Sequence, residues 1–240
     1  MSLDLRSCHA THPGTRRKYN EDRLVDRPDL GLWAVADGAG GHEAGDVASS
    51  LIAAALEGIP AGLNAQAALA QIRTRMDTVH TDVQAEAARR GADVTIASTA
   101  VILCVRGEHY ACLWAGDSRA YRLARGTLQQ ITRDHSLVQE LVDAGQITPE
   151  QAESHPNANV ITRAIGALAT ELVLDKTIDK VSVGDRFLLC SDGLSKSVPE
   201  ADIAAVLAGG GDPATRLIEA ALARQARDNV TAVVIDVVGA

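Results

Sequence analysis

Aromatic residues and positive charge are both scarce in this 240-residue chain. Aromatic side chains make up 2% of the sequence, which leaves few rings for nucleotide bases to stack on and argues against a single-strand nucleic-acid binder. Basic residues number 23 against 31 acidic residues, for a net charge of −8. Because so acidic a chain has no general attraction for phosphate backbones or anionic lipids, we expect neither a nucleic acid nor a membrane among its partners.

Long apolar runs and paired cysteines are lacking as well. No run approaches the ~18 apolar residues of a membrane-spanning helix, and residues 1–14 lack the apolar core of a signal peptide. The four cysteines form no C-x-x-C pair, and Cys104, Cys112 and Cys190 lie inside apolar runs. A free cysteine in such a run behaves as a small hydrophobic residue, which predicts a reducing compartment, and we expect a cytoplasmic protein.

Hydrophobic residues are plentiful, at 46% of the chain, and they suffice for a substantial core without disulfides. No internal repeat, low-complexity tract or Pro/Ser-rich linker divides the sequence. We therefore predict one domain over residues 1–240.

Five stretches carry helix signals. Residues 64–91 place apolar side chains at steps of three and four between an Asn cap and a closing Gly. Residues 47–56 carry a shorter apolar stripe. Three further helix starts are predicted from cap residues at Asp212–Pro213, at Thr148–Gln151 and at Ser197–Glu200, the last as a capping box.

Short apolar runs predict the strands, which we place at 31–36, 98–105, 109–116, 120–124, 185–191 and 230–238. The runs within 98–121 follow one another through tight connections, which favours antiparallel pairing. Strands come in neighbouring pairs with helices between the pairs, so a parallel sheet built by strict alternation of strand and helix is not indicated.

Aspartates stand at the ends of these apolar runs. Asp37, Asp117 and Asp192 follow a run, and Asp228 precedes the last one. In an antiparallel pair the end of one strand neighbours the start of the next, so all four would share one edge. Close carboxylates repel by about 1 kcal/mol in water and several-fold more near a protein surface, unless they share protons or bind cations. Hard oxygen ligands without Cys or His suit Mg²⁺ or Mn²⁺.

Three local features have ordinary explanations as well. Asp-Gly at 37–38 and at 192–193 is a common turn dipeptide, and only the joint pattern of four aspartates favours metal binding. The basic run 16–18 suits a phosphate oxyanion beside a metal cluster, but taken alone it favours a solvated surface. The glycine-rich stretch 37–45 fails the dinucleotide-binding pattern G-x-G-x-x-G because Glu43 takes the sixth position.

Seven motifs occur in a recognisable order: GTRRKYNED (14–22), VADGAGGHEAGDVAS (35–49), AGDSRAY (115–121), DHSLVQELVDAGQIT (134–148), HPNANVITRAIG (155–166), CSDGLS (190–195) and RDNVTAVVI (227–235). Together they resemble the bacterial metal-dependent protein phosphatases, the type 2C or PPM family, over nearly the whole chain. The resemblance implies an α+β fold, an αββα sandwich of two antiparallel β-sheets flanked by helices.

The same resemblance implies an activity. Members remove phosphate from phosphoserine and phosphothreonine in proteins with a metal-activated water at a binuclear Mn²⁺ or Mg²⁺ centre, without a covalent phosphoenzyme. The expected partner is a phosphorylated protein, namely a bacterial Ser/Thr kinase whose signalling the phosphatase counteracts, or a forkhead-associated protein.

Metal ligands carry over residue by residue. Asp37 matches the catalytic aspartate that bridges two metals, and the Gly38 carbonyl matches a ligand of the second. Asp192 and Asp228 match ligands of the first metal. Asp117, together with Asp192, matches a weaker third site in bacterial members. The implied cofactors are thus Mn²⁺ or Mg²⁺ at two tight sites and a weaker third.

The remaining matches surround the metals. Glu21 and Asp22 match an acidic pair near the second metal that acts through water. Arg17 aligns with the catalytic arginine that binds the substrate phosphate. Residues 134–166 match a variable flap beside the site.

One position departs from the family pattern. Bacterial relatives usually read DGMGGH, and animal relatives have a histidine, where this chain has Ala39. The general acid therefore stays open between His42 and a metal-bound water.

Two other functional classes also stay open for this chain. One is a phosphopeptide-binding pseudophosphatase without metals, and the other is a regulator in which cations only hold the strand edges together.

Overall fold

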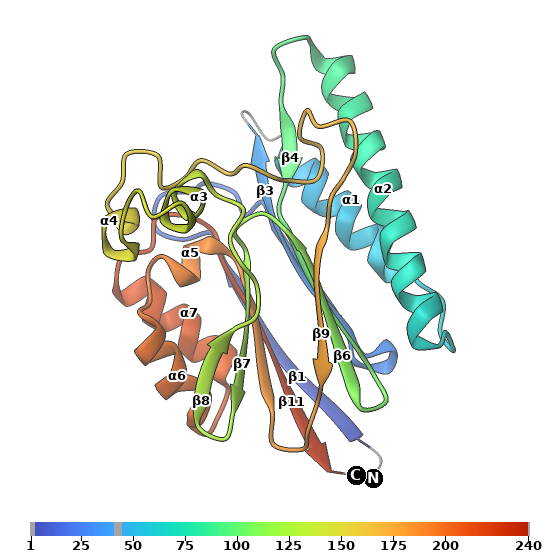
Figure 1. Cartoon of the computed structure of the whole chain (residues 1–240), viewed down its shortest axis with the longest axis vertical. Helices are drawn as coiled ribbons and strands as arrows, with labels where there is room; N and C mark the ends of the chain where they lie inside the picture. The colour runs from blue at the N-terminus through green and yellow to red at the C-terminus, as the bar shows by residue number, and fades with distance from the viewer. Residues whose placement is uncertain (1–2, 41–44, 240) are drawn as a thin grey trace.

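Two antiparallel sheets face each other and carry helices on both outer sides (Figure 1). This arrangement comes from a computed structural model that describes residues 3–40 and 45–239. The expected αββα sandwich is confirmed.

The first sheet joins the two ends of the chain. Its strands, in spatial order, are β1 (Leu3–His12), β11 (Val230–Gly239), β10 (Arg186–Cys190), β7 (Arg119–Ala124) and β8 (Thr127–Gln130). β1 and β11 pair along their full length, from Leu3 opposite Gly239 to His12 opposite Val230. The start of β11 therefore lies next to the loop that follows β1.

The second sheet comes from the first half of the chain and one later strand. Its order is β2 (Asp22–Arg27), β3 (Leu32–Gly40), β5 (Ala100–Arg106), β6 (His109–Ala115) and β9 (Asp175–Lys180), while β4 (Ile96–Ser98) extends β3. A 3-10 turn, Pro28–Leu30, connects β2 to β3. Every pairing is antiparallel, as the tight connections predict.

Helices cover the outer faces of the two sheets. The second sheet is covered by α1 (Gly45–Glu57) and α2 (Ala65–Arg90), and the first by α5 (Asp192–Ser195), α6 (Glu200–Ala208) and α7 (Pro213–Ala223). Two short helices, α3 (Leu137–Asp143) and α4 (Pro149–Glu153), belong to residues 134–166 and lie away from the chain termini (Figure 1). Among the described helices, none is both long enough and apolar enough to cross a membrane.

Most of the predicted helix ends are confirmed. Asn64 Oδ1 accepts the Ala67 N–H at 2.9 Å at the start of α2, and Gly91 closes the helix. Asp212 caps α7, and Thr148 with Gln151 forms a complete capping box at α4. Short polar side chains in these places accept N–H groups that have no partner within the helix.

The predicted capping box at Ser197 is wrong. Helix α6 begins at Glu200, and its N-cap is Pro199 without a side-chain hydrogen bond. The backbone N–H of Ser197 instead donates to the carbonyl of Leu194 at 3.0 Å, so Ser197 completes the turn after α5. Local capping preference was overridden by the turn that directly precedes the helix.

The predicted end of the strand before Asp37 is also wrong. β3 continues through Asp37 to Gly40, because β4 pairs with its last residues, Gly38 opposite Ser98 and Gly40 opposite Ile96. The sequence turns polar and glycine-rich there, yet the neighbouring strand supplies hydrogen bonds that keep the backbone extended.

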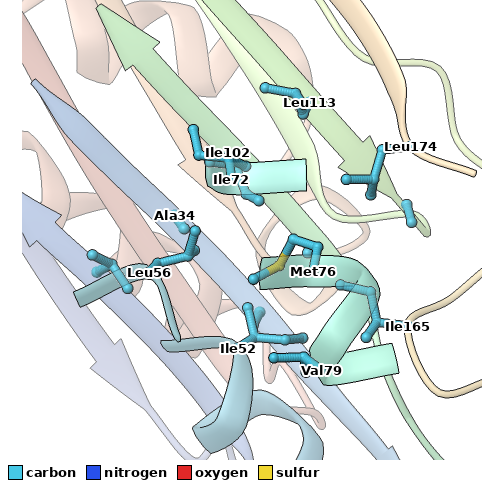
Figure 2. Packing of buried hydrophobic residues seen from close by; sticks show 14 of the residues in the cluster. Ala34, Ile52, Leu56, Ile72, Met76, Val79, Ile102, Leu113, Ile165 and Leu174 are labelled. Atoms are coloured by element: carbon cyan, nitrogen blue, oxygen red, sulfur yellow. The ribbon is translucent and has the colours of Figure 1, made fainter. Parts of the chain in front are cut away.

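Strand alternation divides the core into layers. Along β3, Ala34 and Ala36 face α1 and α2, whereas Trp33 and Val35 face the other sheet. Figure 2 shows the helix-side cluster, in which side chains from both helices meet those of the sheet; the labelled residues include Ile52, Leu56, Ile72, Met76, Ile102 and Leu113. The rigid layers fix where each strand ends and therefore where its terminal side chains lie.

Replacing Phe187 tests the packing between the sheets. The ring is fully buried on β10 and meets the Tyr110 ring edge-to-face, with centroids 4.9 Å apart. We expect Phe187→Ala to lower the free energy of unfolding by about 3–5 kcal/mol in urea denaturation, because it leaves a cavity. Ile178→Ala, at a side chain that is 50% exposed on β9, serves as control; equal losses in both variants would contradict this packing.

Candidate active site

Two carboxylates lie opposite each other at one end of the second sheet. Asp22 begins β2 and pairs with Asp37 in β3. The Asp37 backbone N–H donates to Thr99 Oγ1 at 3.1 Å, and its carbonyl accepts the Thr99 N–H at 2.9 Å. Both main chains are therefore held by the sheet, and the two acidic groups cannot move apart without breaking it.

Asp22 also ties the two sheets together. Its Oδ2 accepts hydrogen bonds from Ser191 Oγ at 2.8 Å and from Thr231 Oγ1 at 2.6 Å. Ser191 directly precedes Asp192, and Thr231 lies at the start of β11. Asp22 is 3% exposed, and its second oxygen has no hydrogen-bond partner among the described residues.

A lysine joins two further carboxylates. Asp192 opens α5, and Asp117 lies in the loop between β6 and β7 with 2% of its surface exposed. Lys196 Nζ donates to Asp192 Oδ2 at 2.7 Å and to Asp117 Oδ2 at 3.0 Å. It also donates to Asn159 Oδ1 at 3.1 Å, which links the pair to residues 134–166. Within the described residues, Asp117 Oδ1 has no partner.

Arg17 and Asp228 form a two-pronged ion pair at the rim. Arg17 Nε donates to Asp228 Oδ1, and Nη2 donates to Oδ2, both at 2.8 Å. The neighbouring Asn229 fixes the loop that carries Arg17. Its Oδ1 accepts the Glu21 N–H at 2.8 Å, while its Nδ2 donates to the carbonyls of Pro13 and Tyr19 at 3.0 Å each.

The backbone is tightly packed at Gly38. A Cβ on Gly38 would lie 2.2 Å from the carbonyl oxygen of Gly45, the first residue of α1, and 2.9 Å from that of Glu21. Ser49 Oγ, one helical turn further along α1, donates to the same Glu21 carbonyl at 2.5 Å. Only glycine fits at position 38, so the N-terminus of α1 can pack directly against β2 and β3.

The acidic groups raise one another's pKa values. Burial raises the pKa of Asp37 well above its usual range, and the charges of Asp22, Asp192, Asp117 and Asp228 raise it further. Burial raises the pKa of Asp22 to about 7 against the lowering effect of its two hydroxyl donors. Burial and then the charge of Asp192 raise the pKa of Asp117 to about 6. The five aspartates therefore share one electrostatic environment.

Lys196 balances part of this charge. Burial lowers the pKa of Lys196, but the charges of Asp192 and Asp117 outweigh that effect and raise the pKa above its ordinary value. Lys196 is therefore an ammonium ion at neutral pH.

The donor set fits divalent cations. Among residues 3–40 and 45–239, no three acidic, histidine or cysteine side chains already surround one point as a ready-made ligand group. Arg17 instead pairs with Asp228, and Lys196 with Asp117 and Asp192, and these carboxylates keep unused lone pairs. Two buried carboxylate oxygens, one on Asp22 and one on Asp117, have no partner in the same residues. Buried anionic oxygens of this kind require a compensating cation or proton, and oxygen-only donors suit Mg²⁺ or Mn²⁺.

A cavity opens beside Asp117 and Lys196. It measures about 800 Å³ and lies between residues 134–159 and the turns around α5 and α6. Its wall includes Asn159 and Glu200. A pocket of this size next to the acidic cluster, with both polar and apolar residues in its wall, accommodates a peptide segment or a small ligand.

Nucleophilic cysteines are not part of this region. Cys104, Cys112 and Cys190 are buried, and desolvation raises the pKa of Cys190 to about 12. The candidate acid His42 lies outside the described residues. Ala39, which replaces the usual family residue, is exposed at the end of β3 opposite Ala97.

The structure thus gathers most of the residues that the sequence analysis singled out. The aspartates at positions 22, 37, 117, 192 and 228 converge, and Arg17 lies against Asp228. Glu21 contributes main-chain contacts beside Gly38. Sequence reasoning missed Lys196, Ser191, Asn229 and Thr231. Only Lys196 left a readable signal, since it follows Asp192 by four residues at the start of a short helix.

The sandwich fold with its acidic cluster is the architecture that the motifs predict for a metal-dependent phosphatase, and comparison with known proteins identifies the family. A family model described as "Protein phosphatase 2C" matches residues 15–228. The chain belongs to the protein phosphatase 2C family, which confirms the resemblance seen in its motifs.

Individual relatives agree with this assignment. The serine/threonine protein phosphatase PstP of Mycobacterium tuberculosis is 40% identical over 99% of the chain, which spans 46% of PstP. A structure of the PstP catalytic domain in complex with two manganese ions has a TM-score of 0.86 at 37% identity, covering 99% of this chain and 100% of that one. The structure of PppA, described as a key regulatory component of T6SS in Pseudomonas aeruginosa, has a TM-score of 0.90 at 44% identity. The match covers 98% of this chain and 100% of that one.

Removing the buried carboxyl of Asp22 tests its raised pKa. An unfolded Asp has a pKa of about 3.9, so between about pH 4 and 7 the folded chain holds a proton that the unfolded chain has lost. The free energy of unfolding in EDTA should therefore fall as pH rises through this interval, by on the order of a few kcal/mol. In Asp22→Asn this fall should be smaller by the share of one carboxyl, because Asp37 and Asp117 also have raised pKa values and still contribute to it, as measured by urea denaturation at a series of pH values.

Asp93→Asn provides the control, because Asp93 is exposed in the loop after α2. Its pH dependence should match that of the wild type. Equal slopes in all three proteins would show that Asp22 does not hold a proton in the folded chain.

Proposed function

We propose that this chain is a protein serine/threonine phosphatase that hydrolyses phosphoserine and phosphothreonine with two divalent cations, Mn²⁺ or Mg²⁺. The observation that carries the proposal is the convergence of five aspartates from both sheets, with the Arg17 guanidinium at their rim. A dense set of hard oxygen donors beside a phosphate-binding cation matches metal-assisted phosphoryl hydrolysis.

Specific residues would hold the cations. The charges of both Asp22 and Asp192 act on the Asp37 carboxyl, and Asp37 would be the ligand that the two cations share. The Gly38 carbonyl with Glu21 and Asp22 would serve one ion, and Asp192 with Asp228 the other. A third cation would need Asp117 and Asp192, whose carboxylates here share the Lys196 ammonium. Bound cations would supply Lewis acidity and lower the pKa of water, as in other metal-dependent hydrolases.

Arg17 would bind and orient the phosphoryl group. Asp228 engages two of its N–H groups, and a guanidinium has five, so three remain for phosphate oxygens. Because Asp228 and Asn229 together fix the guanidinium and its loop, the arginine is oriented before substrate arrives. Such preorganisation lowers the cost of placing the phosphate for in-line attack.

The phosphoprotein substrate we propose is a Ser/Thr kinase or a forkhead-associated protein, and the proposed location is the cytoplasm. The four cysteines are free, as expected in a reducing compartment. We further propose that residues 1–240 act as a single catalytic domain and that residues 134–166 form a flap. The cavity between this flap and α6 supports a role for the flap in substrate contact.

Phosphate release from a phosphothreonine peptide tests the activity. Hydrolysis in Mn²⁺ that is abolished by EDTA supports the proposal. Binding of the peptide without phosphate release identifies a pseudophosphatase instead. A Mn²⁺-dependent rise in melting temperature with neither peptide binding nor hydrolysis identifies a regulator in which cations only hold strand edges together.

The proposed metal ligand Asp192 gives a direct prediction. We expect Asp192→Asn to reduce kcat in Mn²⁺ at least about 100-fold, because a charged ligand is lost and the cations carry most of the charge stabilisation. Circular dichroism should show an unchanged fold. Asp93→Asn, in an exposed loop, should retain full activity. Near wild-type turnover in Asp192→Asn would contradict the assignment of Asp192 as a metal ligand.

Arg17 is predicted to act on substrate binding. Arg17→Ala should raise KM for the peptide about 10- to 100-fold with a smaller change in kcat, since charge-assisted hydrogen bonds contribute about 1.5–3 kcal/mol. Arg16→Ala removes the same charge from the adjacent exposed position and should change KM little. An unchanged KM in Arg17→Ala would show that the arginine does not contact the phosphate.

A further inference from the structure

Lys196 occupies an unusual place in the acidic cluster. Its Nζ lies 2.7 Å from Asp192 Oδ2 and 3.0 Å from Asp117 Oδ2, so one ammonium ion bridges carboxylates from two separate elements. A third hydrogen bond, 3.1 Å long, runs to Asn159 Oδ1. These three acceptors satisfy all three N–H groups of the ammonium.

The local backbone holds the lysine in this position. The Lys196 N–H donates to the carbonyl of Asp192 at 2.8 Å, which places the lysine one helical turn after the aspartate. The turn itself is fixed, because a Cβ on Gly193 would lie 2.0 Å from the Asn229 carbonyl oxygen. The lysine side chain is 35% exposed, whereas Asp117 is 2% exposed and cannot rotate out to water.

A divalent cation bound to the same two oxygens, Asp117 Oδ2 and Asp192 Oδ2, would need the space that Nζ occupies. Mg²⁺ binds carboxylate oxygens at about 2.0–2.1 Å, so an ion on both Asp117 Oδ2 and Asp192 Oδ2 would overlap the ammonium or lie in contact with it. The positive charge of the lysine would also repel the ion, and because the Asp117 side chain is 2% exposed, solvent screens this repulsion less than at the surface.

We propose that Lys196 is a built-in third cation, which fills the position between Asp117 and Asp192 and leaves this chain with two divalent-cation sites. The inference rests on the proposed metal site and adds to it. The same ammonium connects the cluster to Asn159, so the flap is anchored without a third metal ion.

Counting bound Mn²⁺ in a neutral variant tests the proposal. Lys196→Met keeps the length of the side chain and removes its charge. Isothermal titration calorimetry, with electron paramagnetic resonance of free Mn²⁺ as a second count, should give two ions for the wild type and three for Lys196→Met. The third ion should bind to Lys196→Met at a roughly tenfold lower Mn²⁺ concentration than any third ion binds to the wild type, because the competing charge is gone.

Two further variants locate the added ion. Lys180→Met, at an exposed lysine on β9, should bind two ions like the wild type. Lys196→Met combined with Asp117→Asn should return to two, because the added site needs the Asp117 carboxylate. A third ion retained in the double variant would place it elsewhere and overturn the proposal.

The outcomes separate the two proposals. Three ions in both the wild type and Lys196→Met, or two in both, would overturn the role of Lys196 while leaving the phosphatase site intact. Absence of Mn²⁺ binding in every variant would overturn the metal site itself, and the role of Lys196 with it. If Lys196→Met loses its near-ultraviolet circular dichroism, Lys196→Gln replaces it in the same titrations.

Discussion

Repulsion among buried carboxylates is the constraint on which the rest of this structure depends. Five aspartates converge where the two sheets meet, and burial raises the pKa of the most central of them, Asp37, well above its usual range. Hydroxyl donors from Ser191 and Thr231 stabilise Asp22, Arg17 pairs with Asp228, and Lys196 bridges two more carboxylates. Among the described residues, some buried oxygens of this cluster still lack a partner, and such oxygens favour binding of cations. The cluster is therefore not an ordinary part of the protein core.

The sandwich is what makes such a cluster feasible. β2 and β3 bring one pair of aspartates to the end of the second sheet, and β10 and β11 bring another to the end of the first. Asp22 then crosses between the sheets through its hydroxyl partners. The three apolar layers are rigid, so the carboxylates cannot relax apart, and their repulsion persists until protons or cations compensate it.

Helices and strands that carry an apolar periodicity or cap residues could be predicted from the sequence. Features that depend on contacts between distant residues could not. Helix α2 could be predicted because its cap residues and its apolar stripe indicate the same helix. The edge strands β1, β2, β8 and β9 escaped prediction, since much of each faces solvent and its sequence is largely polar. The predicted capping box at Ser197 was wrong because the backbone N–H of Ser197 is hydrogen-bonded within the turn that precedes α6. Asn229 could not be assigned a role, because its partners are backbone groups more than 200 residues away.

By itself the sequence determined the family, the sandwich and the short list of acidic residues, since motifs, strand periodicity and aspartates beside apolar runs are local properties. Tertiary structure decided which charges meet. The pairing of Arg17 with Asp228 joins residues 211 positions apart, and Lys196 reaches Asp117 across 79. Electrostatic contact depends on distance in space, and a linear pattern specifies that distance only within a helical turn or a strand pair.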